Sequence, residues 1–243
     1  MFPLASKATL TLFTFLSLVA IVVSAPIPSH SRRDEPSHLV RRSVMDLSKF
    51  TLQTPDDAST PGNELKNNAF VKITDSSIQL TVPKGNCKTT ANSKHCRTEF
   101  KENTDHSPSG TNTMTVTLSA QPDPGSSCIG QIFGHDTDTD KPLLQVYYHT
   151  DGSITLGVQQ NKAGGHEKVV KVAQTVKVGT KFTYKLDFSK GKLGFTLNGK
   201  HQDLTPDLKY TPKFYFKFGD YAQGPAGKSE SSVTVFSAVT SHS

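Results

Sequence analysis

The segment spanning residues 213–221 alternates phenylalanine with side chains that can bind ions or exchange protons. Tyr215 and Lys217 occupy odd-numbered positions, and the even-numbered positions between 214 and 218 are all phenylalanine. Because successive strand residues point to opposite faces, we expect the phenylalanines in a core and Tyr215 and Lys217 on the other face. Tyr221 joins them if the strand continues past Gly219. One face of this strand therefore offers phenols and a cation to a ligand.

Two further segments repeat this arrangement. Residues 95–101 place four side chains on one face of a strand: His95, Arg97, Glu99 and Lys101. In residues 131–135, Gln131 shares a face with Phe133, and with His135 if the strand continues, while Ile132 points inward. These faces carry more varied polar chemistry than solubility requires. The alternative is an ordinary solvated sheet face, in which Arg97 and Glu99 pair with cross-strand neighbours.

Strands that could position these side chains recur at short spacing along residues 70–240. Apolar residues alternate with polar ones in residues 78–82, 114–118 and 182–188. Asp151-Gly152 and Asn198-Gly199 lie between such runs and are strong signals for hairpin turns. About ten to fourteen strands, with no helix-length pattern of period 3.6, predict an all-β fold of two packed antiparallel sheets, a jelly roll or related sandwich.

Composition and charge limit the function classes. The chain has 243 residues, 34% of them hydrophobic, which suffices for one medium-sized core. Its formal net charge is +6, but only 20% of the residues are charged and like charges do not form long runs. This pattern argues against a nucleic-acid-binding arm and is compatible with an acidic ligand.

The N-terminal segment has the features of a targeting sequence. Residues 1–25 combine Lys7, an apolar run and the small residues Ser24 and Ala25, which predicts a signal peptide. The run is too short and too rich in Thr and Ser for a membrane span. Residues 26–42 contain two Arg-Arg pairs and are predicted to be a propeptide. We expect residues 43–243 to form a single domain that is secreted, extracellular and monomeric, with no membrane or nucleic-acid partner.

Three cysteines in an exported chain suggest one disulfide and one leftover thiol. Cys87 and Cys96 bracket a polar stretch that is typical of a loop between two strands, and we expect these two to be bonded. Cys128 is then the unpaired cysteine, and we expect it to be buried.

The three polar segments resemble motifs of the alginate-lyase-type polysaccharide lyase superfamily. Residues 97–101, Arg-Thr-Glu-Phe-Lys, resemble its Arg-(Ser/Thr)-Glu-(Leu/Val)-Arg motif, and residues 131–133, Gln-Ile-Phe, resemble Gln-(Ile/Val)-His. Residues 215–223 resemble the longer and more specific Tyr-Phe-Lys-Ala-Gly-x-Tyr-x-Gln motif. Residues 45–50 resemble the opening strand, so the likeness covers residues 43–243. It implies a two-sheet antiparallel β-jelly-roll sandwich with a concave substrate cleft.

Two residues depart from the superfamily motifs. Lys101 replaces an arginine, which keeps the charge but loses the bidentate fork. Phe133 stands where relatives that cleave alginate carry a histidine. The fungal glucuronan lyases resemble this sequence more closely, because there a histidine just ahead of the arginine motif serves instead, and His95 occupies that place.

The resemblance implies β-elimination on a 1,4-linked polyuronate, in which the C5 proton is removed and the O4 leaving group is protonated. Arg97 and Gln131 are expected to neutralise the substrate carboxylate and stabilise the charge that develops there. Tyr221 is expected to take the proton from C5 and to give it to O4. Lys217, Arg97 and His95 are expected to lower the pKa of its phenol. A second assignment stays open, in which His95 is the base and Tyr221 the acid.

Four further residues of these strands are expected to contribute to substrate binding: Tyr215, Lys217, Glu99 and Lys101. Tyr215 and Lys217 would line the cleft, and Lys217 could bind a neighbouring uronate. Glu99 would orient Arg97 or Lys101. Glucuronate and mannuronate carry the C5 hydrogen and O4 on the same side, which Tyr221 can serve alone, so we expect glucuronan to be cut fastest, poly-mannuronate weakly and poly-guluronate least.

No cofactor is required for this chemistry. The acidic run of residues 135–140 could hold a structural Ca²⁺, although it lacks the Gly and terminal Glu of an EF-hand loop. Histidine and cysteine show no zinc spacing. Five histidines other than His95 are expected mostly at the surface: His106, His135, His149, His166 and His201. The competing functions are a non-catalytic carbohydrate-binding sandwich on the same scaffold and a glycoside hydrolase, which would need two carboxylates where these strands clearly supply only Glu99.

Overall fold

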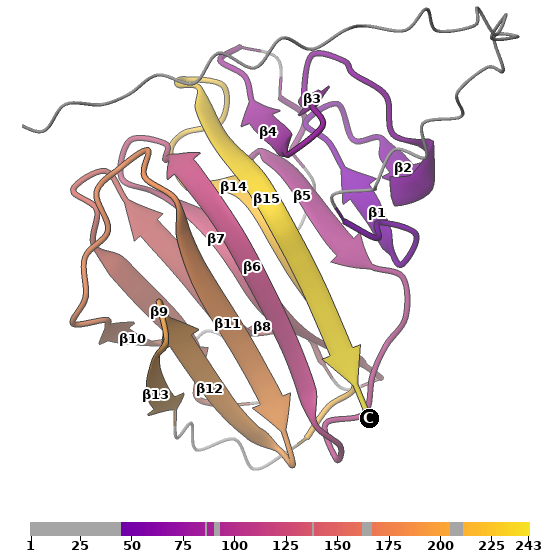
Figure 1. The fold of residues 1–243 in the computed structure, drawn as a ribbon, viewed down its shortest axis with the longest axis vertical. Coiled ribbons are helices and arrows are strands. Elements are labelled where there is room, and N and C mark those ends of the chain that lie inside the picture. The colour runs from indigo at the N-terminus through magenta and orange to yellow at the C-terminus, as the bar shows by residue number, and fades with distance from the viewer. Residues whose placement is uncertain (1–44, 86, 90–92, 138, 162–166, 205–210) are drawn as a thin grey trace, which may run out of the picture. The chain divides into compact units, whose positions relative to one another are not determined.

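The alternating segments form antiparallel strands in two layers (Figure 1). The computed structural model describes residues 45–85, 87–89, 93–137, 139–161, 167–204 and 211–243. All of these lie in one unit, Arg41–Ser243. The predicted signal peptide and propeptide, residues 1–25 and 26–42, lie outside the described residues.

One layer is an eight-stranded antiparallel sheet with the spatial order β10-β9-β8-β7-β14-β5-β1-β2. Its strands are β1 (Phe50–Gln53), β2 (Ser59–Pro61), β5 (Arg97–Glu102), β7 (Ser126–Asp136), β8 (Thr139–His149), β9 (Ile154–Gln159), β10 (Glu167–Lys171) and β14 (Phe214–Ala222). The three segments singled out from the sequence are β5, β7 and β14, which are direct neighbours in the order β7-β14-β5.

The other layer is a seven-stranded antiparallel sheet with the order β13-β12-β11-β6-β15-β4-β3. Its strands are β3 (Val71–Ile73), β4 (Ile78–Val82), β6 (Asn112–Gln121), β11 (Phe182–Ser189), β12 (Lys192–Leu197), β13 (Lys200–Leu204) and β15 (Ser231–His242). A short 3-10 turn, η1 (Gly62–Glu64), is the only helical element of the described residues. No helix in this part of the chain is long and apolar enough to cross a membrane.

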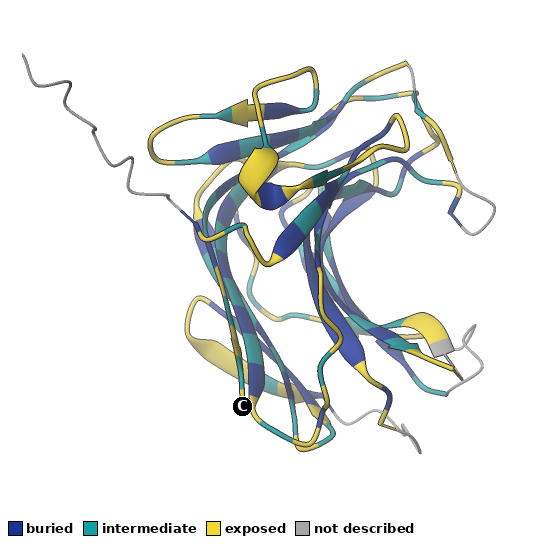
Figure 2. Cartoon of the chain, turned by 90° about the vertical axis from the view of Figure 1, so that its right-hand side faces the viewer, coloured by how far each residue is buried: buried dark blue, intermediate teal, exposed yellow. Residues whose placement is uncertain are grey.

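The core lies between the two sheets, where the apolar half of each alternating strand is buried (Figure 2). β6 and β11 bury every second residue, and their inward side chains Met114, Val116, Tyr184 and Leu186 have exposed fractions of 0%. The predicted hairpin turns are present, with Gly152 at φ 81° between β8 and β9 and Asn198 and Gly199 at positive φ between β12 and β13. The predicted all-β, two-sheet antiparallel sandwich is confirmed.

The disulfide prediction is also confirmed. Cys87 and Cys96 are bonded, with 5.9 Å between their Cα atoms. Cys128 is free and fully buried in β7, as expected. Burial raises the pKa of its thiol to about 12, so this cysteine is an inert packing residue.

Candidate active site

A cleft of about 590 Å³ lies over the outer face of the eight-stranded sheet, the face turned away from the core. Four of the predicted site residues line it together: His95, Arg97, Gln131 and Tyr221. They come from the start of β5, from β7 and from β14, strands that the hydrogen-bond ladder places side by side. The loop between β1 and β2 and the residues around the disulfide border the cleft at its side.

Gly219 allows β14 to bring Tyr221 into this cleft. The pairing of β14 with β7 is irregular between Phe218 and Tyr221, while the pairing with β5 stays regular and places Tyr221 opposite Arg97. Gly219 has φ 146°, and a Cβ added there would lie 2.6 Å from the carbonyl oxygen of Thr98. A larger residue would therefore push β14 away from β5. The strand does continue past Gly219, and Tyr221 shares the face of Lys217.

The Tyr221 hydroxyl is positioned by Ser93, a serine that precedes β5. Its oxygen lies 2.8 Å from Ser93 Oγ, and Ser93 Oγ donates to the His95 carbonyl oxygen at 3.2 Å. Since the single serine proton is used there, Tyr221 is the donor to Ser93 and its phenol is protonated.

The ring of Tyr221 contacts a cation and an imidazole. The Arg97 guanidinium carbon lies 4.4 Å from the ring centroid, and the His95 ring meets it edge-on at 5.9 Å. Burial nevertheless raises the pKa of Tyr221, and this outweighs the lowering by the Ser93 hydrogen bond and by Arg97. The expectation that cationic neighbours lower this pKa overall is therefore wrong, because desolvation is the larger effect. Tyr221 is suited to donate a proton.

His95 is oriented by the backbone. Its Nδ1 lies 3.2 Å from the carbonyl oxygen of Gly224, which can only accept, so Nδ1 carries the proton. In the neutral ring, Nε2 then keeps its lone pair. Asp123, which is buried, accepts the backbone N–H of Gly224 and the hydroxyl of Ser229 and thereby holds this segment. His95 is therefore held in one orientation at the cleft, with Nε2 able to accept a proton.

Beneath the cleft floor lies a buried polar cluster around Glu99, whose exposed fraction is 0%. Glu99 Oε2 lies 2.5 Å from Lys217 Nζ and 3.9 Å from Arg97 Nη1, and Glu99 Oε1 accepts a hydrogen bond from Gln131 Nε2 at 2.5 Å. Glu99 does reach Arg97, as expected, but its close partners are Lys217 and Gln131, and Lys101 is not among them. Glu99 thus positions Gln131, whose second amide proton stays free for a substrate carboxylate.

The structure does not place Lys217 on the lining of the cleft. Only 2% of this residue is exposed, its ammonium is bound to Glu99, and burial lowers its pKa. The expectation that Lys217 binds a neighbouring uronate is thus contradicted by its depth below the surface. Its geometry fits a structural role, in which the Lys217 ammonium holds the Glu99 carboxylate in place.

Tyr215 and Lys101 lie at the other end of the same face. Tyr215 is 5% exposed and its ring stacks on Phe133 at 5.1 Å, with Lys101 Nζ 4.3 Å from the Tyr215 centroid. Phe133 lines the cleft, whereas Tyr215 and Lys101 do not. The predicted shared face of Phe133 and His135 is present, since both rings contact Tyr215.

Sequence reasoning missed three residues of this region. Tyr147 of β8 lines the cleft, and the alternation of β8, which buries Val146 and Tyr148 in the core, could have identified it. Ser93 and Asp123 act through residues far away in the sequence, and no local pattern marks them. The acidic run expected to bind Ca²⁺ forms the turn between β7 and β8, and residue 138 lies outside the described residues, so this site stays a prediction.

Comparison with known proteins points to one family. The sequence model described as alginate lyase matches residues 45–242. Among solved structures, alginate lyase A1-II′, a member of polysaccharide lyase family-7, superposes with a TM-score of 0.73 at 25% identity and covers 82% of this chain and 97% of that chain. A variant of that enzyme in complex with substrate (GGMG) superposes with a TM-score of 0.72 at 25% identity. It covers 81% of this chain and 94% of that chain.

A second neighbour is alginate lyase PA1167 from Pseudomonas aeruginosa, with a TM-score of 0.70, 23% identity and coverage of 82% of this chain and 100% of that chain. No curated protein sequence matches the chain. The substrate complex was obtained with a variant that carries a His-to-Asn and a Tyr-to-Phe substitution, and a Tyr-to-Phe variant alone was crystallised with product (GGG).

Proposed function

Because the chain belongs to the alginate lyase family and is a polysaccharide lyase, we propose that it cleaves a 1,4-linked polyuronate by β-elimination in the cleft over β5, β7 and β14. The observation that carries the proposal is the meeting of Tyr221, His95, Arg97 and Gln131 in that cleft. Each of the four has a chemical task that elimination requires.

Charge neutralisation falls to Arg97 and Gln131. A C5 proton next to an ionised carboxylate is barely acidic, so the enzyme must stabilise the negative charge that grows on that carboxylate. Arg97 supplies a charged fork of donors, and Gln131 supplies the amide proton that Glu99 does not use. Both are held by a buried carboxylate, so they are in place before the substrate arrives.

Proton transfer falls to His95 and Tyr221. His95 presents the Nε2 lone pair, because Nδ1 is bound to the Gly224 carbonyl oxygen, and takes the C5 proton as the base. Tyr221 keeps its own proton, because burial raises its pKa, and gives that proton to the O4 leaving group as the acid. The neighbour variants that hold substrate or product have lost a tyrosine hydroxyl, which supports this role.

The positions of these two groups favour particular uronates. The rings of His95 and Tyr221 touch edge-on, so both approach the sugar from the same wall. Glucuronate and mannuronate carry the C5 hydrogen and O4 on the same side, whereas guluronate carries them on opposite sides. Phe133 replaces the histidine of alginate-cleaving relatives and packs on Tyr215. We therefore place glucuronan first, poly-mannuronate second and poly-guluronate last.

The site of action is part of the proposal. Residues 1–25 direct export, residues 26–42 are removed at their Arg-Arg pairs, and the remaining domain acts as an extracellular monomer. N-terminal sequencing of the protein from the culture medium, combined with size-exclusion chromatography, tests this part. A product that begins at Met1 or elutes as a dimer would contradict it.

The decisive experiment follows the ultraviolet absorbance of the conjugated double bond that elimination creates. Purified protein is mixed separately with glucuronan, poly-mannuronate and poly-guluronate, and His95→Gln is assayed beside the wild type. We expect absorbance to rise fastest on glucuronan and His95→Gln to lose most of the rate while still binding the polymer. Polymer binding without absorbance on any of the three would support the non-catalytic sandwich instead.

A further inference from the structure

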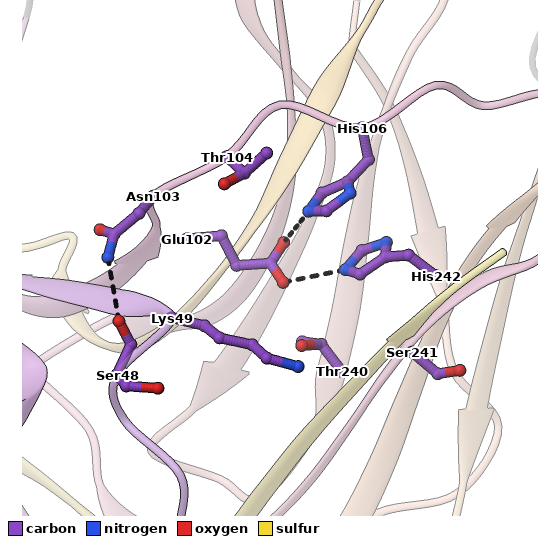
Figure 3. Close-up of a pocket in the computed structure, with 9 residues that line it drawn as sticks. All are labelled: Ser48, Lys49, Glu102, Asn103, Thr104, His106, Thr240, Ser241 and His242. Atoms are coloured by element: carbon purple, nitrogen blue, oxygen red, sulfur yellow. Dashed lines mark hydrogen bonds and ion pairs between the residues drawn. The ribbon is translucent and has the colours of Figure 1, made fainter.

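At the end of β5, on the side opposite to the cleft, a buried glutamate meets two histidines. Glu102, His106 and His242 present ligand atoms that all lie within 4.8 Å of one another, and no other such group of three is found among the described residues. Glu102 ends β5 in one sheet, His242 ends β15 in the other, and His106 follows β5 (Figure 3). The fold therefore brings His106, which we expected at the surface, together with His242, which lies far from it in the sequence.

The protonation of His242 can be assigned from its partners. Asn112 Nδ2 donates to the carbonyl oxygens of Ser107 and Phe188, both at 3.0 Å, so Asn112 Oδ1 is the atom that faces His242 Nδ1 at 2.9 Å. Nδ1 of His242 must therefore carry a proton. In the neutral ring, Nε2 has only a lone pair.

That lone pair points at a carboxylate. Nε2 of His242 lies 3.0 Å from Glu102 Oε1, while Glu102 Oε2 accepts the backbone N–H of Phe216 at 2.8 Å. Two acceptors at this distance need a positive ion between them, either a proton or a metal. Nε2 of His106 lies 3.9 Å from the same carboxylate, which provides a third donor atom.

We propose that Glu102, His106 and His242 form a binding site for one divalent transition-metal ion, with Zn²⁺ as the representative. Two imidazole nitrogens and one carboxylate oxygen are a donor set that suits Zn²⁺ and its neighbours in the first row. Asn112 supplies the outer hydrogen bond that fixes the tautomer of a metal-binding histidine. A pocket of about 650 Å³ beside the three residues leaves room for water as a further ligand.

Binding requires a small local movement. The rings of His106 and His242 stack 3.4 Å apart with an angle of 2° between their planes, so their lone pairs run side by side. A shared ion requires one ring to turn. His106 can do this, because its ring makes no hydrogen bond to any described residue and is 22% exposed, whereas His242 is held by Asn112.

One nearby charge opposes the ion. The Lys49 side chain extends along the same pocket, and its positive charge is felt at His106 (Figure 3). Its stem is flexible, so the ammonium can move away at a cost in affinity. The site stands roughly 17 Å along β5 from Arg97, by the usual rise per residue, and on the inner face of the strand. It is therefore independent of the lyase chemistry, and it would join the ends of the two sheets.

Isothermal titration of the full chain with ZnCl₂, after removal of metals with EDTA, tests the proposal. We expect one saturable site in the wild type, and at least about tenfold weaker binding in His106→Gln and in His242→Gln. His201→Gln is the matched control, since His201 Nε2 also lies 3.1 Å from a carboxylate oxygen, that of Asp203, but without a second histidine. Its affinity should equal that of the wild type.

Three further measurements separate a metal site from an ion pair. Zn²⁺ should raise the Tm of the wild type but not that of His242→Gln. Co²⁺ should give visible d–d absorption bands in the wild type that are absent when either histidine is replaced. Lys49→Gln should bind Zn²⁺ more tightly than the wild type at low ionic strength. Lyase activity in EDTA shows that each variant is folded. Absence of saturable binding, or binding that persists in the His106→Gln/His242→Gln double variant, would overturn the proposal in favour of a protonated His242–Glu102 pair.

Discussion

Tyr221 and Tyr215 share one face of β14, yet the structure uses them differently. Tyr221 lines the cleft with its hydroxyl on Ser93 and its ring beside His95 and Arg97. Tyr215 is nearly buried, and its ring packs between Phe133 and the Lys101 ammonium. The neighbouring strands decide this difference, because one end of the face meets polar groups and the other end meets an aromatic ring.

The largest difference in kcat is expected when the tyrosine hydroxyl is removed at one end of this face of β14 or at the other. Tyr221→Phe should lower kcat by about 10³-fold, within the usual range for a lost acid–base group, while the fold and polymer binding persist. Tyr215→Phe should change kcat by less than about threefold, since Tyr215 does not line the cleft and its hydroxyl takes no part in proton transfer. Steady-state rates on glucuronan measure both. Equal losses in the two variants would remove the distinction between the two ends of β14.

The second effect concerns Glu99, which lies between the two ends. Glu99→Gln leaves the Lys217 ammonium buried without its counter-charge, so we expect the free energy of unfolding to fall by about 3 kcal/mol, along with a large loss of activity. Urea denaturation measures the stability. The double variant Glu99→Gln/Lys217→Met should recover part of the stability but not the activity, because a neutral amide still replaces the carboxylate that faces Arg97 and binds Gln131. Recovery of both would contradict the positioning role.

The third effect concerns the residue next to Tyr221 on the inner face. Asp220 is fully buried, and burial raises its pKa to about 7 although the hydroxyls of Ser231 and Ser127 oppose the shift. An unfolded aspartate has a pKa of about 4. Between these values the folded state binds more protons than the unfolded state, so raising the pH lowers the free energy of unfolding.

Asp220→Asn should remove this pH dependence. Thermal melts at pH values across that window should show a falling Tm in the wild type and a nearly constant Tm in the variant. Asp203→Asn, at an exposed position, is the control and should behave like the wild type. Behind Tyr215 the neighbouring inward residues are Phe214 and Phe216, so no such titration is expected at that end. A wild-type Tm that rises across the window would contradict the assignment.

The smallest effect is a change of preference at the Tyr215 end. Phe133→His places an imidazole in the lining of the cleft, at the position of the histidine in the Gln-(Ile/Val)-His motif. We expect the rate on poly-guluronate to rise severalfold relative to that on glucuronan, with Tyr221 still required. The ratio of the two rates is the measurement. An unchanged ratio would show that Phe133 does not determine which uronate is accepted.

Strand alternation predicted the fold and most of the cleft, because the period of two is a local property of the chain. It correctly placed Tyr221, Arg97 and Gln131 on one face, and the turn residues and the Cys87–Cys96 bond were equally local. Depth is not local. Alternation assigns Lys217 and Tyr221 to the same face, but only the fold shows that Lys217 is buried and binds Glu99.

Electrostatic consequences were equally hidden from the sequence. Arg97 near Tyr221 suggested a lowered pKa, but the extent of burial reverses the direction. His106 and His242 lie far apart in the chain, and their stacking follows from the meeting of the ends of β5 and β15. Interactions of this kind depend on which distant segments become neighbours.

The disulfide constrains a segment that borders the candidate active site. Cys96 adjoins His95, and the ring closed by its bond to Cys87 also contains Ser93, the partner of Tyr221. The main core between the two sheets consists of other residues, whereas Cys96 belongs to a small second cluster with Val82 and Ala222. The bond therefore constrains the segment that carries His95 and Ser93 more directly than it constrains the main core. Reduction of the Cys87–Cys96 bond is therefore expected to lower activity more than it lowers the free energy of unfolding.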